Sequence, residues 1–461
     1  MKKKFDYDLI VLGSGSAGAS AALFAAGAGQ KVALVENGKW GGSALNGSDI
    51  PRRATFEFSH LYSEARRGSR FGLSSASLRY NFPTVVSWRS LVARRAGAGS
   101  KRPFEDAKIA CVSGFASFLS PYEVAVGDKI LASQKFVLAT GSKPAFDNIS
   151  GVESATCLTP EAALALPRPP KSVFIVGAGS TGCELAEYFA ELGSSVILAD
   201  LAGRLLPRED EEVGQLLGSY FETSLRIKVL TQSRVVAIEK LPGSGLEQKV
   251  VFLRGGQEKS VKTNLIVLAT GSRPVTDFGL ENAGVKFDKS GIIVDDTLRT
   301  SMKHIYAAGD CLGGESSAER AAYEGALAAS NLLGKTKNLR NYEGFIRVTD
   351  TFPSVATTGL TEDDCVKQGL KCQKAVLPLS SVSAANTSDF RYGFVKLLAD
   401  SKDKLLGATV VCPSAELVIQ EVATAVRHKF TVTQLASTPH VSSSWSELVH
   451  LAAKKLAQPK K

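Results

Sequence analysis

The sequence predicts an α/β protein with two Rossmann-like units and a third, C-terminal part. The segments DLIVLGSGSAG (residues 8–18) and SVFIVGAGSTG (residues 172–182) each indicate a buried strand that runs into a G-x-G-x-x-G turn at a helix start. Each unit is followed by a near-identical phrase, KFVLATGSKP at 135–144 and LIVLATGSRP at 265–274. The chain therefore contains an internal duplication.

The first unit has the features of a dinucleotide-binding site. Its glycines are Gly13, Gly15 and Gly18, and an Ala-rich helical stretch follows them. The next predicted strand, KVALVE, ends at Glu36, 23 positions after Gly13, where an acidic side chain accepts hydrogen bonds from a ribose diol. We expect the pyrophosphate at the helix N-terminus, because free backbone N–H groups and the helix dipole favour an anion there.

The second unit repeats these features. Its glycines are Gly177, Gly179 and Gly182, and Asp200 again lies 23 positions after the first glycine. Two such units predict two dinucleotides. The Asp200 carboxylate favours NAD because it repels a 2′-phosphate, whereas Arg204 and Arg208 just beyond it soften that preference.

A third phrase, TSMKHIYAAGDC at 300–311, ends a predicted strand on Gly309 and Asp310. A carboxylate bordered by glycine is suited to accept hydrogen bonds from the hydroxyls of a sugar chain. A simple turn is the alternative interpretation.

Length and composition limit the class of protein. The chain has 461 residues, well beyond the roughly 250–300 at which one core stops growing, so several domains are expected. An apolar fraction of 44% with 22% charged residues excludes a disordered or fibrous class. The seven cysteines include no C-x-x-C pair, which argues against a disulfide framework or a zinc site. The nearest pair, Cys365 and Cys372, is interpreted as ordinary reduced thiols.

The charge pattern and hydropathy favour a cytoplasmic location. The net charge of +10 is spread along the chain, which suits anionic ligands or at most weak membrane-surface association, and no motif indicates nucleic acid. Asp6 and Asp8 interrupt the N-terminal stretch that would otherwise resemble a secretory signal. No uninterrupted apolar run approaches the 18 or so residues of a spanning helix.

Over nearly its whole length the sequence resembles the class I pyridine nucleotide-disulfide oxidoreductases, the flavoprotein family of glutathione reductase, dihydrolipoamide dehydrogenase and mercuric reductase. The resemblance implies an FAD-binding domain at 1–150 and 280–340 and an NAD(P)-binding domain at 151–279. FPSVATTGLTEDD and GFVKLLADSKDKLLGATVV are similar to the family's α+β dimerisation domain, which is expected at 341–461. A homodimer follows from the same resemblance.

The resemblance also assigns residues to each cofactor. FAD is expected to contact Gly13, Gly15, Ser16, Ala17, Gly18, Glu36, Gly42, Ser43, Thr140, Gly141 and Asp310. NAD(P)H, with NADH favoured, is expected to contact Gly177, Gly179, Ser180, Thr181, Gly182, Glu184, Asp200 and Gly271. No metal is expected. Ser180 stands where some members of the family place an aromatic gate over the nicotinamide pocket.

The segment WGGSALNGSDIPRRA (residues 40–54) departs from the family. In the family, this segment has the sequence GG-T-C-L-N-V-G-C-I-P-S-K, whose two cysteines pass electrons from flavin to substrate. Here Ala44 stands at the first cysteine and Asp49 at the second. The C-terminal signature H-x-H-P-T-x-S-E appears as HVSSSWSE, so that His440 and Glu447 remain but Ser442 replaces the catalytic histidine. The thiols and their base are lost together, which argues that dithiol chemistry was abandoned as a unit.

Four residues are the candidates for the remaining chemistry: Arg53, Glu184, Asp49 and Glu447. Arg53 replaces the family's lysine near flavin N5, and Glu184 stands at the position of its partner. A permanent guanidinium charge there favours a flavin that takes on negative charge. Asp49 is either a proton donor held protonated by burial or a space-filling partner of an arginine. Trp445 is interpreted as an interface aromatic rather than as a platform for a planar acceptor.

These observations predict an FAD-dependent NAD(P)H oxidoreductase without a catalytic disulfide. Hydride is expected to pass from NAD(P)H to flavin, and electrons then pass directly to a small acceptor such as a quinone, as in a diaphorase. One alternative is a soluble pyridine nucleotide transhydrogenase. An alternative of another class is a catalytically inactive flavoprotein that serves as a binding or scaffold module. Cys183 and Cys311 are expected to be small buried hydrophobes.

Overall fold

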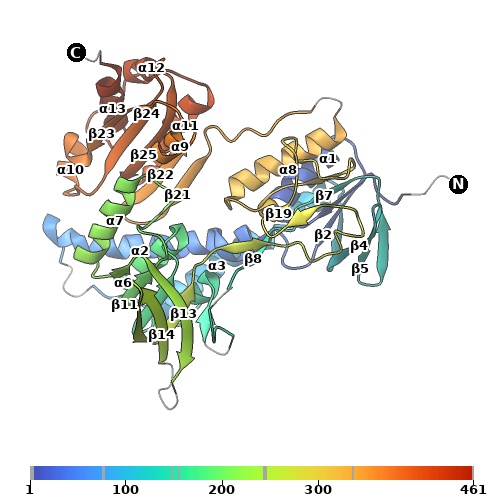
Figure 1. Cartoon of the computed structure of the whole chain (residues 1–461), viewed down its shortest axis with the longest axis horizontal. Coiled ribbons are helices and arrows are strands. Elements are labelled where there is room, and N and C mark those ends of the chain that lie inside the picture. The colour runs from blue at the N-terminus through green and yellow to red at the C-terminus, as the bar shows by residue number, and fades with distance from the viewer. Residues whose placement is uncertain are drawn as a thin grey trace. The chain divides into compact units, whose positions relative to one another are not determined.

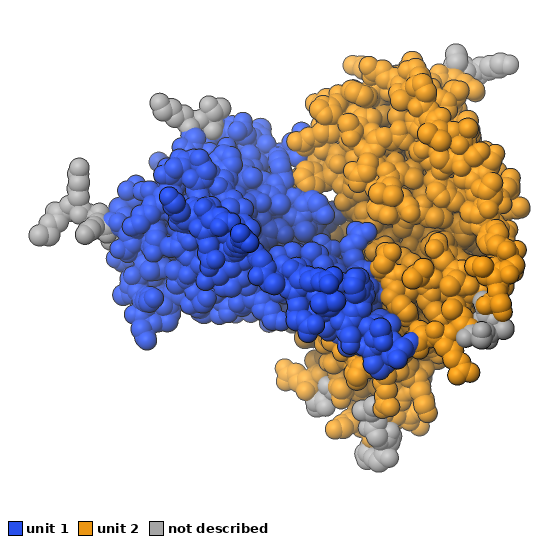
Figure 2. Space-filling view, turned by 180° about the vertical axis from the view of Figure 1, so that it is seen from behind, with its two compact units in different colours: residues 1–55, 81–145, 271–341 blue, residues 56–80, 146–270, 342–461 orange. Residues whose placement is uncertain are grey.

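The computed structural model describes residues 5–74, 78–146, 149–153, 156–241, 247–334 and 337–458. The chain divides into two compact units, which Figure 2 colours separately. Unit 1 comprises residues 1–55, 81–145 and 271–341, and unit 2 comprises residues 56–80, 146–270 and 342–461. The long helix α2 (Ile50–Arg67) begins in unit 1 and ends in unit 2.

Unit 1 is built on a parallel five-stranded sheet in the order β20-β7-β1-β2-β3. Its strands are β1 (Leu9–Leu12), β2 (Val32–Glu36), β3 (Ala110–Ser113), β7 (Phe136–Leu138) and β20 (Ile305–Ala307). Helices α1 (Ser16–Gly27) and α8 (Ala318–Leu333) lie side by side (Figure 1) and cover one face, against Leu9 and Val11 of β1. The alternate residues Ile10 and Leu12 face a second core. Both faces of this sheet are therefore buried, which explains the uninterrupted apolar strands.

The second core of unit 1 is closed by an antiparallel meander of β4 (Ala116–Ser120), β5 (Glu123–Val126) and β6 (Lys129–Ala132). A short ribbon pairs β8 (Ser142–Pro144) with β17 (Ser272–Pro274), so the two near-identical phrases of the sequence meet here. The remaining elements of unit 1 are η1 (Ala44–Ser48), α3 (Phe82–Ala98), α4 (Arg102–Asp106), β18 (Phe287–Asp288), β19 (Gly291–Ile292) and η3 (Asp310–Leu312).

Unit 2 contains a second parallel five-stranded sheet, in the order β12-β11-β10-β16-β9. Its strands are β9 (Cys157–Leu158), β10 (Ser172–Val176), β11 (Ser195–Ala199), β12 (Lys228–Leu230) and β16 (Leu265–Leu268). One face packs on an antiparallel sheet of β13 (Ser233–Lys240), β14 (Gln248–Arg254) and β15 (Gln257–Thr263). The helices of this part are α5 (Pro160–Leu164), α6 (Ser180–Glu191) and α7 (Glu211–Thr223).

The C-terminal part of unit 2 is an antiparallel sheet in the order β21-β22-β25-β24-β23. Its strands are β21 (Ile346–Thr349), β22 (Ser354–Gly359), β23 (Gln373–Pro378), β24 (Phe394–Ala399) and β25 (Leu405–Cys412). The helical elements are α9 (Glu362–Lys367), η4 (Leu379–Ser381), α10 (Ser383–Thr387), α11 (Ala415–Arg427), α12 (Val432–Ser437) and α13 (Glu447–Ala457), and η2 (Gly68–Phe71) follows α2. Apolar side chains of α11, α12 and α13 form one core with this sheet.

This is the predicted α/β arrangement, with two Rossmann-like sheets and a C-terminal α+β part. Because all strands of each Rossmann-like sheet are parallel, their carboxyl ends share one edge, which is where ligands bind in such sheets. Among the residues described, no helix is both long enough and apolar enough to cross a bilayer.

Candidate cofactor sites

The first glycine turn lies directly after β1, and its three glycines have different structural roles. Gly13 has a φ of +100°, and a Cβ there would collide with the backbone oxygen of Ala139. A Cβ on Gly18 would collide with the oxygen of Gly13. A Cβ on Gly15 would meet no atom within 4 Å. Gly13 and Gly18 are therefore required by packing, whereas Gly15 faces open space at the N-terminus of α1, where a phosphate can approach the backbone.

The second turn, after β10, repeats this division. Gly177 has a φ of +105°, and a Cβ there would collide with the oxygen of Ala269. A Cβ on Gly182 would collide with the oxygen of Gly177, and one on Gly179 would meet no atom within 4 Å. Residues Ser180 and Thr181 then open α6. The two glycine turns thus have the same construction, and each leaves space beside the backbone at a helix N-terminus.

Glu36 ends β2 beside the first turn. Its Oε2 accepts hydrogen bonds from the backbone N–H of Ser14 at 2.8 Å and from the Ser14 hydroxyl at 2.6 Å, and its Oε1 accepts one from the N–H of Gly38 at 2.7 Å. The Ser14 hydroxyl also accepts a hydrogen bond from the N–H of Gly41 at 2.9 Å. A carboxylate can accept about four hydrogen bonds, so Glu36 keeps capacity for a ribose hydroxyl while it holds the turn in shape.

Asp200 follows β11 in the same way. Its two carboxylate oxygens accept hydrogen bonds from the backbone N–H groups of Ala178, at 2.5 Å, and Ala202, at 2.6 Å. Arg204 is bound elsewhere, because its Nη2 lies 2.7 Å from a carboxylate oxygen of Asp363. Arg208 is exposed.

The other predicted FAD residues of unit 1 lie along the same sheet edge. Thr140 and Gly141 follow β7, and the Thr140 hydroxyl donates to the backbone oxygen of Val275 at 3.0 Å. Asp310 follows β20 and accepts a hydrogen bond from the Ser142 hydroxyl at 3.1 Å. The carboxyl ends of β1, β2, β7 and β20 therefore collect these polar groups in one row.

Two residues that sequence analysis missed support this row. Glu324 of α8 is 1% exposed, and its carboxylate accepts hydrogen bonds from the N–H of Gly309 at 2.7 Å and from Nε of Arg320 at 2.8 Å. It thereby holds the backbone that presents Asp310. Ser14, inside the glycine motif, joins Glu36 to the loop at Gly41. Ser14 could not be predicted because it occupies a position of the G-x-G-x-x-G motif at which any residue is allowed. Glu324 could not be predicted because it lies at no characteristic spacing from a recognisable motif.

The segment that departs from the family forms a short helix. Residues Ala44–Ser48 make one π-helical turn (η1), Asp49 ends it, and α2 begins at the next residue. The backbone approaches the first glycine turn closely, since a Cβ on Gly42 would lie 2.7 Å from the Cα of Gly15. The predicted FAD residues Gly42 and Ser43 therefore lie beside the open position at Gly15.

The four candidate catalytic residues fall into both units. Asp49 and Arg53 lie one turn apart, and the N–H of Arg53 donates to the oxygen of Asp49 at 2.9 Å. Glu184 lies on α6 and is 2% exposed. Glu447 begins α13. The pairing of Arg53 with Glu184 that the resemblance implies stays a prediction.

Glu184 is held firmly within unit 2. Its Oε1 accepts hydrogen bonds from the Ser180 hydroxyl at 3.0 Å and from the N–H of Asp350 at 2.8 Å. Ser180 therefore positions a buried carboxylate on the first turns of α6. The hydrogen bond from Ser180 to Glu184 could not be predicted from the sequence, which indicated Ser180 only as a nicotinamide-nucleotide contact that lacks an aromatic ring.

The C-terminal signature is held by two acidic residues, Glu447 within it and Glu421 of α11. The Nε2 of His440 lies 2.7 Å from a carboxylate oxygen of Glu421, and the Nδ1 lies 2.8 Å from the oxygen of Thr438. Glu447 accepts a hydrogen bond from the N–H of Ser443 at 2.8 Å. Trp445 packs against the core of its own C-terminal sheet. Burial raises the pKa of Glu421, and the adjacent His440 opposes that shift.

The cysteines of both Rossmann-like parts are buried or half-buried and free. Cys183 and Cys311 have no exposed surface, as expected. Burial raises the pKa of the Cys311 thiol to about 12 and that of Cys157 to about 11. Thiols in such surroundings are poor nucleophiles. None of these cysteines has the environment of a reactive thiol.

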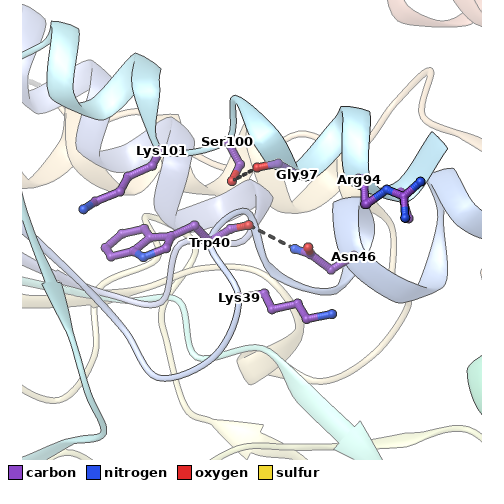
Figure 3. A pocket seen from close by; sticks show the side chains of 8 residues that line it. Lys39, Trp40, Asn46, Arg94, Gly97, Ser100 and Lys101 are labelled. Atoms are coloured by element: carbon purple, nitrogen blue, oxygen red, sulfur yellow. Dashed lines mark hydrogen bonds between the residues drawn. The ribbon is translucent and has the colours of Figure 1, made fainter. Parts of the chain in front are cut away.

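A pocket of about 410 Å³ lies beside η1 in unit 1 (Figure 3). Trp40 and Asn46 line this pocket, and the Asn46 amide donates hydrogen bonds to the backbone oxygens of Trp40, at 3.0 Å, and Gly42, at 2.8 Å. The remaining lining residues are Lys39, Ala93, Arg94, Gly97, Ser100 and Lys101. With three cationic side chains and no acidic one, this pocket favours anions.

Comparisons with known proteins show the family to which the chain belongs. Residues 7–325 match the model of the pyridine nucleotide-disulphide oxidoreductases, and residues 346–453 match the dimerisation domain of the same family. The chain is 32% identical over 438 residues to a mercuric reductase of Bacillus cereus, a match that covers 94% of this chain and 69% of that protein. It is 29% identical over 453 residues to a dihydrolipoyl dehydrogenase of Bacillus subtilis (strain 168), which covers 97% of this chain and 95% of that protein.

Solved structures show the same fold. The crystal structure of LpdA from Mycobacterium tuberculosis superposes with a TM-score of 0.88 at 25% identity, covering 98% of this chain and 99% of that one. The flavoprotein disulfide reductase RclA from Escherichia coli superposes with a TM-score of 0.85 at 22% identity, covering 98% and 100%. The two Rossmann-like sheets and the C-terminal sheet are thus parts of one known architecture. The chain belongs to the pyridine nucleotide-disulphide oxidoreductase family, whose members are FAD-dependent and use NAD(P)H.

Proposed function

We propose that this protein is an FAD-dependent NAD(P)H oxidoreductase that reduces a small acceptor, such as a quinone, without a catalytic disulfide. The observation that carries the proposal is the segment around η1, where Ala44 and Asp49 stand at the two positions that the family resemblance assigns to cysteines. The first cysteine of the chain is Cys111. Without sulfur in this segment, electrons have no thiol relay to the substrate.

The proposal assigns a role to each cofactor and to the residues around it. FAD, when bound, would accept hydride from NAD(P)H and then pass electrons to the acceptor. Gly15 and Gly179 leave room for the two pyrophosphates, and Glu36 and Asp200 retain capacity for the ribose hydroxyls. Arg53 keeps a permanent positive charge near the flavin, because a guanidinium does not lose its proton in proteins. Asp49 is either the proton donor to the acceptor or a structural residue.

NADH is the proposed reductant. Asp200 favours a free 2′-hydroxyl, and Arg204, which would soften this preference, is bound to Asp363. An arginine engaged in a hydrogen-bonded ion pair is not free to bind a 2′-phosphate. Arg208 is exposed and is the residue that we expect to account for any residual use of NADPH.

An anaerobic titration tests the proposal directly. Purified protein with bound FAD is mixed with NADH and, separately, with NADPH, and the visible absorption band of the flavin is followed. We expect rapid, stoichiometric bleaching by NADH, recovery on addition of a water-soluble quinone, and no turnover of a disulfide substrate. Disulfide-reductase turnover comparable to quinone turnover would overturn the proposal.

The same titration separates the alternatives. A soluble transhydrogenase needs only the two dinucleotide sites, and substantial reduction of the flavin by both NADH and NADPH, with transfer between them, would favour it. A scaffold module would bind FAD but show no bleaching with either nucleotide. The intact second glycine turn and its acidic partner argue against the scaffold, since a module without redox activity has no need of a nicotinamide site.

We also propose that the protein acts as a homodimer, through the part of the chain that matches the family's dimerisation domain. The predicted FAD domain (1–150 and 280–340), NAD(P) domain (151–279) and dimerisation domain (341–461) belong to the same proposal. Light scattering on the eluted protein should give about twice the chain mass of 48.8 kDa. A monomer with full quinone turnover would contradict the dimer.

A further inference from the structure

The pocket of about 410 Å³ beside η1 is not part of either predicted cofactor site. None of its lining residues is among those expected to contact FAD or NAD(P)H. Its volume lies in the range of small-molecule sites, which is about 300–1,000 Å³. Two of the lining residues, Lys39 and Arg94, are exposed, so solvent reaches the pocket. The pocket is therefore large enough and accessible enough for a small ligand of its own.

The three cations of the pocket are poorly neutralised by the chain itself. Lys39 and Arg94 form no ion pair with any carboxylate that the structure describes. Lys101 lies 3.5 Å from Glu105, but the two side chains are 44% and 57% exposed, and surface pairs of this kind contribute little. Positive charge gathered in a concave site raises the local concentration of anions. The charges of this pocket therefore select a ligand that is negatively charged.

The neutral polar groups of the pocket are hydrogen-bond acceptors. The Nδ2 of Asn46 is occupied, because it donates to the oxygens of Trp40 and Gly42, and only an NH2 group can bond two carbonyl oxygens. The Oδ1 of Asn46 accepts no hydrogen bond from the described residues. The Ser100 hydroxyl donates to the oxygen of Gly97 at 2.8 Å, so its own oxygen stays free to accept. A ligand that satisfies these acceptors must bring a donor, such as a hydroxyl group.

The apolar walls of the pocket are fixed in place. The ring of Trp40 packs against Phe104, with centroids 6.2 Å apart, and Phe104 is 3% exposed. On the other side, Ala93 and Gly97 lie one turn apart on α3. A Cβ on Gly97 would lie 3.3 Å from Oδ1 of Asn46, so glycine keeps this space open. A lining that is ordered in advance lowers the entropic cost of binding a ligand.

Figure 3 shows the cations on two sides of the pocket. The ammonium of Lys101 lies 5.5 Å from the ring centroid of Trp40, and the side chains of Lys39 and Arg94 extend to the opposite side. We propose that the pocket binds a small organic dianion that carries a hydroxyl group between two acidic groups, which are carboxylates or phosphates. Arg94 and Lys39 bind one acidic group, since a guanidinium fork matches the geometry of either anion. Lys101 binds the other, and the hydroxyl donates to the acceptors between them.

The pocket and the predicted FAD site share a loop but no residue. Asn46 donates to the oxygen of Gly42, and a Cβ on Gly42 would lie 2.7 Å from the Cα of Gly15. A ligand bound to Oδ1 of Asn46 therefore contacts the loop that carries Gly42 without taking the place of FAD. The site is independent of the proposed quinone reduction, and it should bind its ligand in protein that is loaded with FAD.

Isothermal titration calorimetry of the FAD-loaded full chain at low ionic strength tests the proposal. Malate and 3-phosphoglycerate each carry two acidic groups and a hydroxyl, and the tighter of the two assigns carboxylate or phosphate to the second acidic group. Succinate lacks the hydroxyl, and we expect it to bind about 2–10-fold more weakly than malate. Lactate lacks the second acidic group, and we expect it to bind at least about tenfold more weakly, because a charge-assisted contact is lost.

Two neighbouring arginines provide a matched pair of variants. Arg94 lines the pocket, whereas Arg95 is also exposed on α3 but does not line it. We expect Arg94→Gln to weaken malate binding at least about tenfold and Arg95→Gln to change it less than about twofold, although both remove one positive charge. In Lys101→Gln we expect malate to bind no more tightly than lactate, since the contact that distinguishes them is gone.

Four outcomes would contradict the proposal. The first is that neither malate nor 3-phosphoglycerate binds the FAD-loaded chain, or that either binds only after FAD is removed, which would make the pocket part of the FAD site. The second is that saturating NAD+ abolishes binding, which would place the anion in the nicotinamide-nucleotide site. The third is that sulfate binds as tightly as malate. The fourth is an equal loss in Arg94→Gln and Arg95→Gln, which would mean that only the net charge attracts the anion.

Discussion

Asp49 stands at the end of η1, one turn before Arg53, at the position that the family resemblance assigns to the sulfur beside the flavin. The sequence identified this residue because it lies in an otherwise familiar frame. Its role could not be predicted, since a carboxylate can either hold a transferable proton or form an ion pair, and neither alternative has a linear signature. The distinction therefore has to be made by experiment.

We expect Asp49→Asn to slow quinone reduction about 100-fold while leaving ferricyanide reduction unchanged, if Asp49 delivers a proton, since general acids contribute about that much or more. A quinone takes up protons as it is reduced, whereas ferricyanide takes only electrons. Steady-state turnover with NADH and each acceptor gives the comparison. Equal losses with both acceptors, or no loss with either, would show that Asp49 is structural.

The two glycine turns illustrate what can be predicted at the scale of an element. Strand, glycines, helix and acidic residue follow each other within about 30 residues, so local sequence specifies them, and the structure confirms them twice. Glu324 and Ser14 were missed because their partners, Gly309 and Gly41, are brought to them by tertiary folding. Lys396 was missed for another reason: it lies in FVKLLA, a strand in which every residue is buried.

Matched alanine variants of the first turn should separate packing from cofactor binding. In Gly18→Ala the added methyl group would collide with the oxygen of Gly13. We expect this substitution to lower the free energy of unfolding by at least about 1–3 kcal/mol. Gly15→Ala finds no atom within 4 Å and a φ of −64° that alanine tolerates. We expect Gly15→Ala to fold normally but to bind FAD at least about tenfold more weakly, because the methyl group occupies the approach of the pyrophosphate.

Urea unfolding of the cofactor-free proteins and fluorescence titration with FAD provide the two measurements. If the Gly15→Ala protein binds FAD as tightly as the unsubstituted chain, the pyrophosphate does not bind at this position. A Gly18→Ala protein of unchanged stability would contradict the close packing of α1 against the turn.

At the scale of the whole molecule, Lys396 joins the two parts of unit 2. Its side chain is 1% exposed, and its ammonium lies 3.1 Å from Asp210, 3.1 Å from Glu212 and 2.6 Å from Glu362. The first two lie at the start of α7 and the third lies on α9. These three carboxylates are also the one cluster of possible metal ligands among the described residues, and the ammonium of Lys396 contacts all three.

Replacement of this lysine should be costly. We expect Lys396→Met to lower the free energy of unfolding by about 3–5 kcal/mol, because Asp210 and Glu212 lose this cation in a partly buried site and Glu362 keeps only Lys374. Lys374→Met is the control, since Lys374 also pairs with Glu362 at 2.6 Å but is 47% exposed, and it should cost less than about 1 kcal/mol. Urea unfolding measures both. Similar values for the two variants would mean that burial does not strengthen the Lys396 contacts.

The same cluster gives the stability a pH dependence at both extremes. Hydrogen bonds from Lys374 and then Lys396 lower the pKa of Glu362, so its contribution is present above the unfolded value of about 4.3 and is lost as pH falls. Burial lowers the pKa of Lys396, but the three carboxylates outweigh it and raise the pKa, so its contribution is lost only as pH rises beyond about 10.4. Urea midpoints measured from pH 3 to 11 should fall at both ends, and the acid loss should shrink in Lys396→Met.

The glycines required for packing and those that leave open space should respond differently when a library of variants is screened. Gly13, Gly18, Gly177 and Gly182 are fixed by steric exclusion, so a library screened only for folded, protease-resistant protein should retain glycine at these four positions. Gly15 and Gly179 have free space around them and should tolerate small residues in that screen. We expect glycine to be required at these two positions only when the library is selected for binding of flavin or nicotinamide nucleotide. Two selections on one library would thus read out, residue by residue, which constraints come from the fold and which from its ligands.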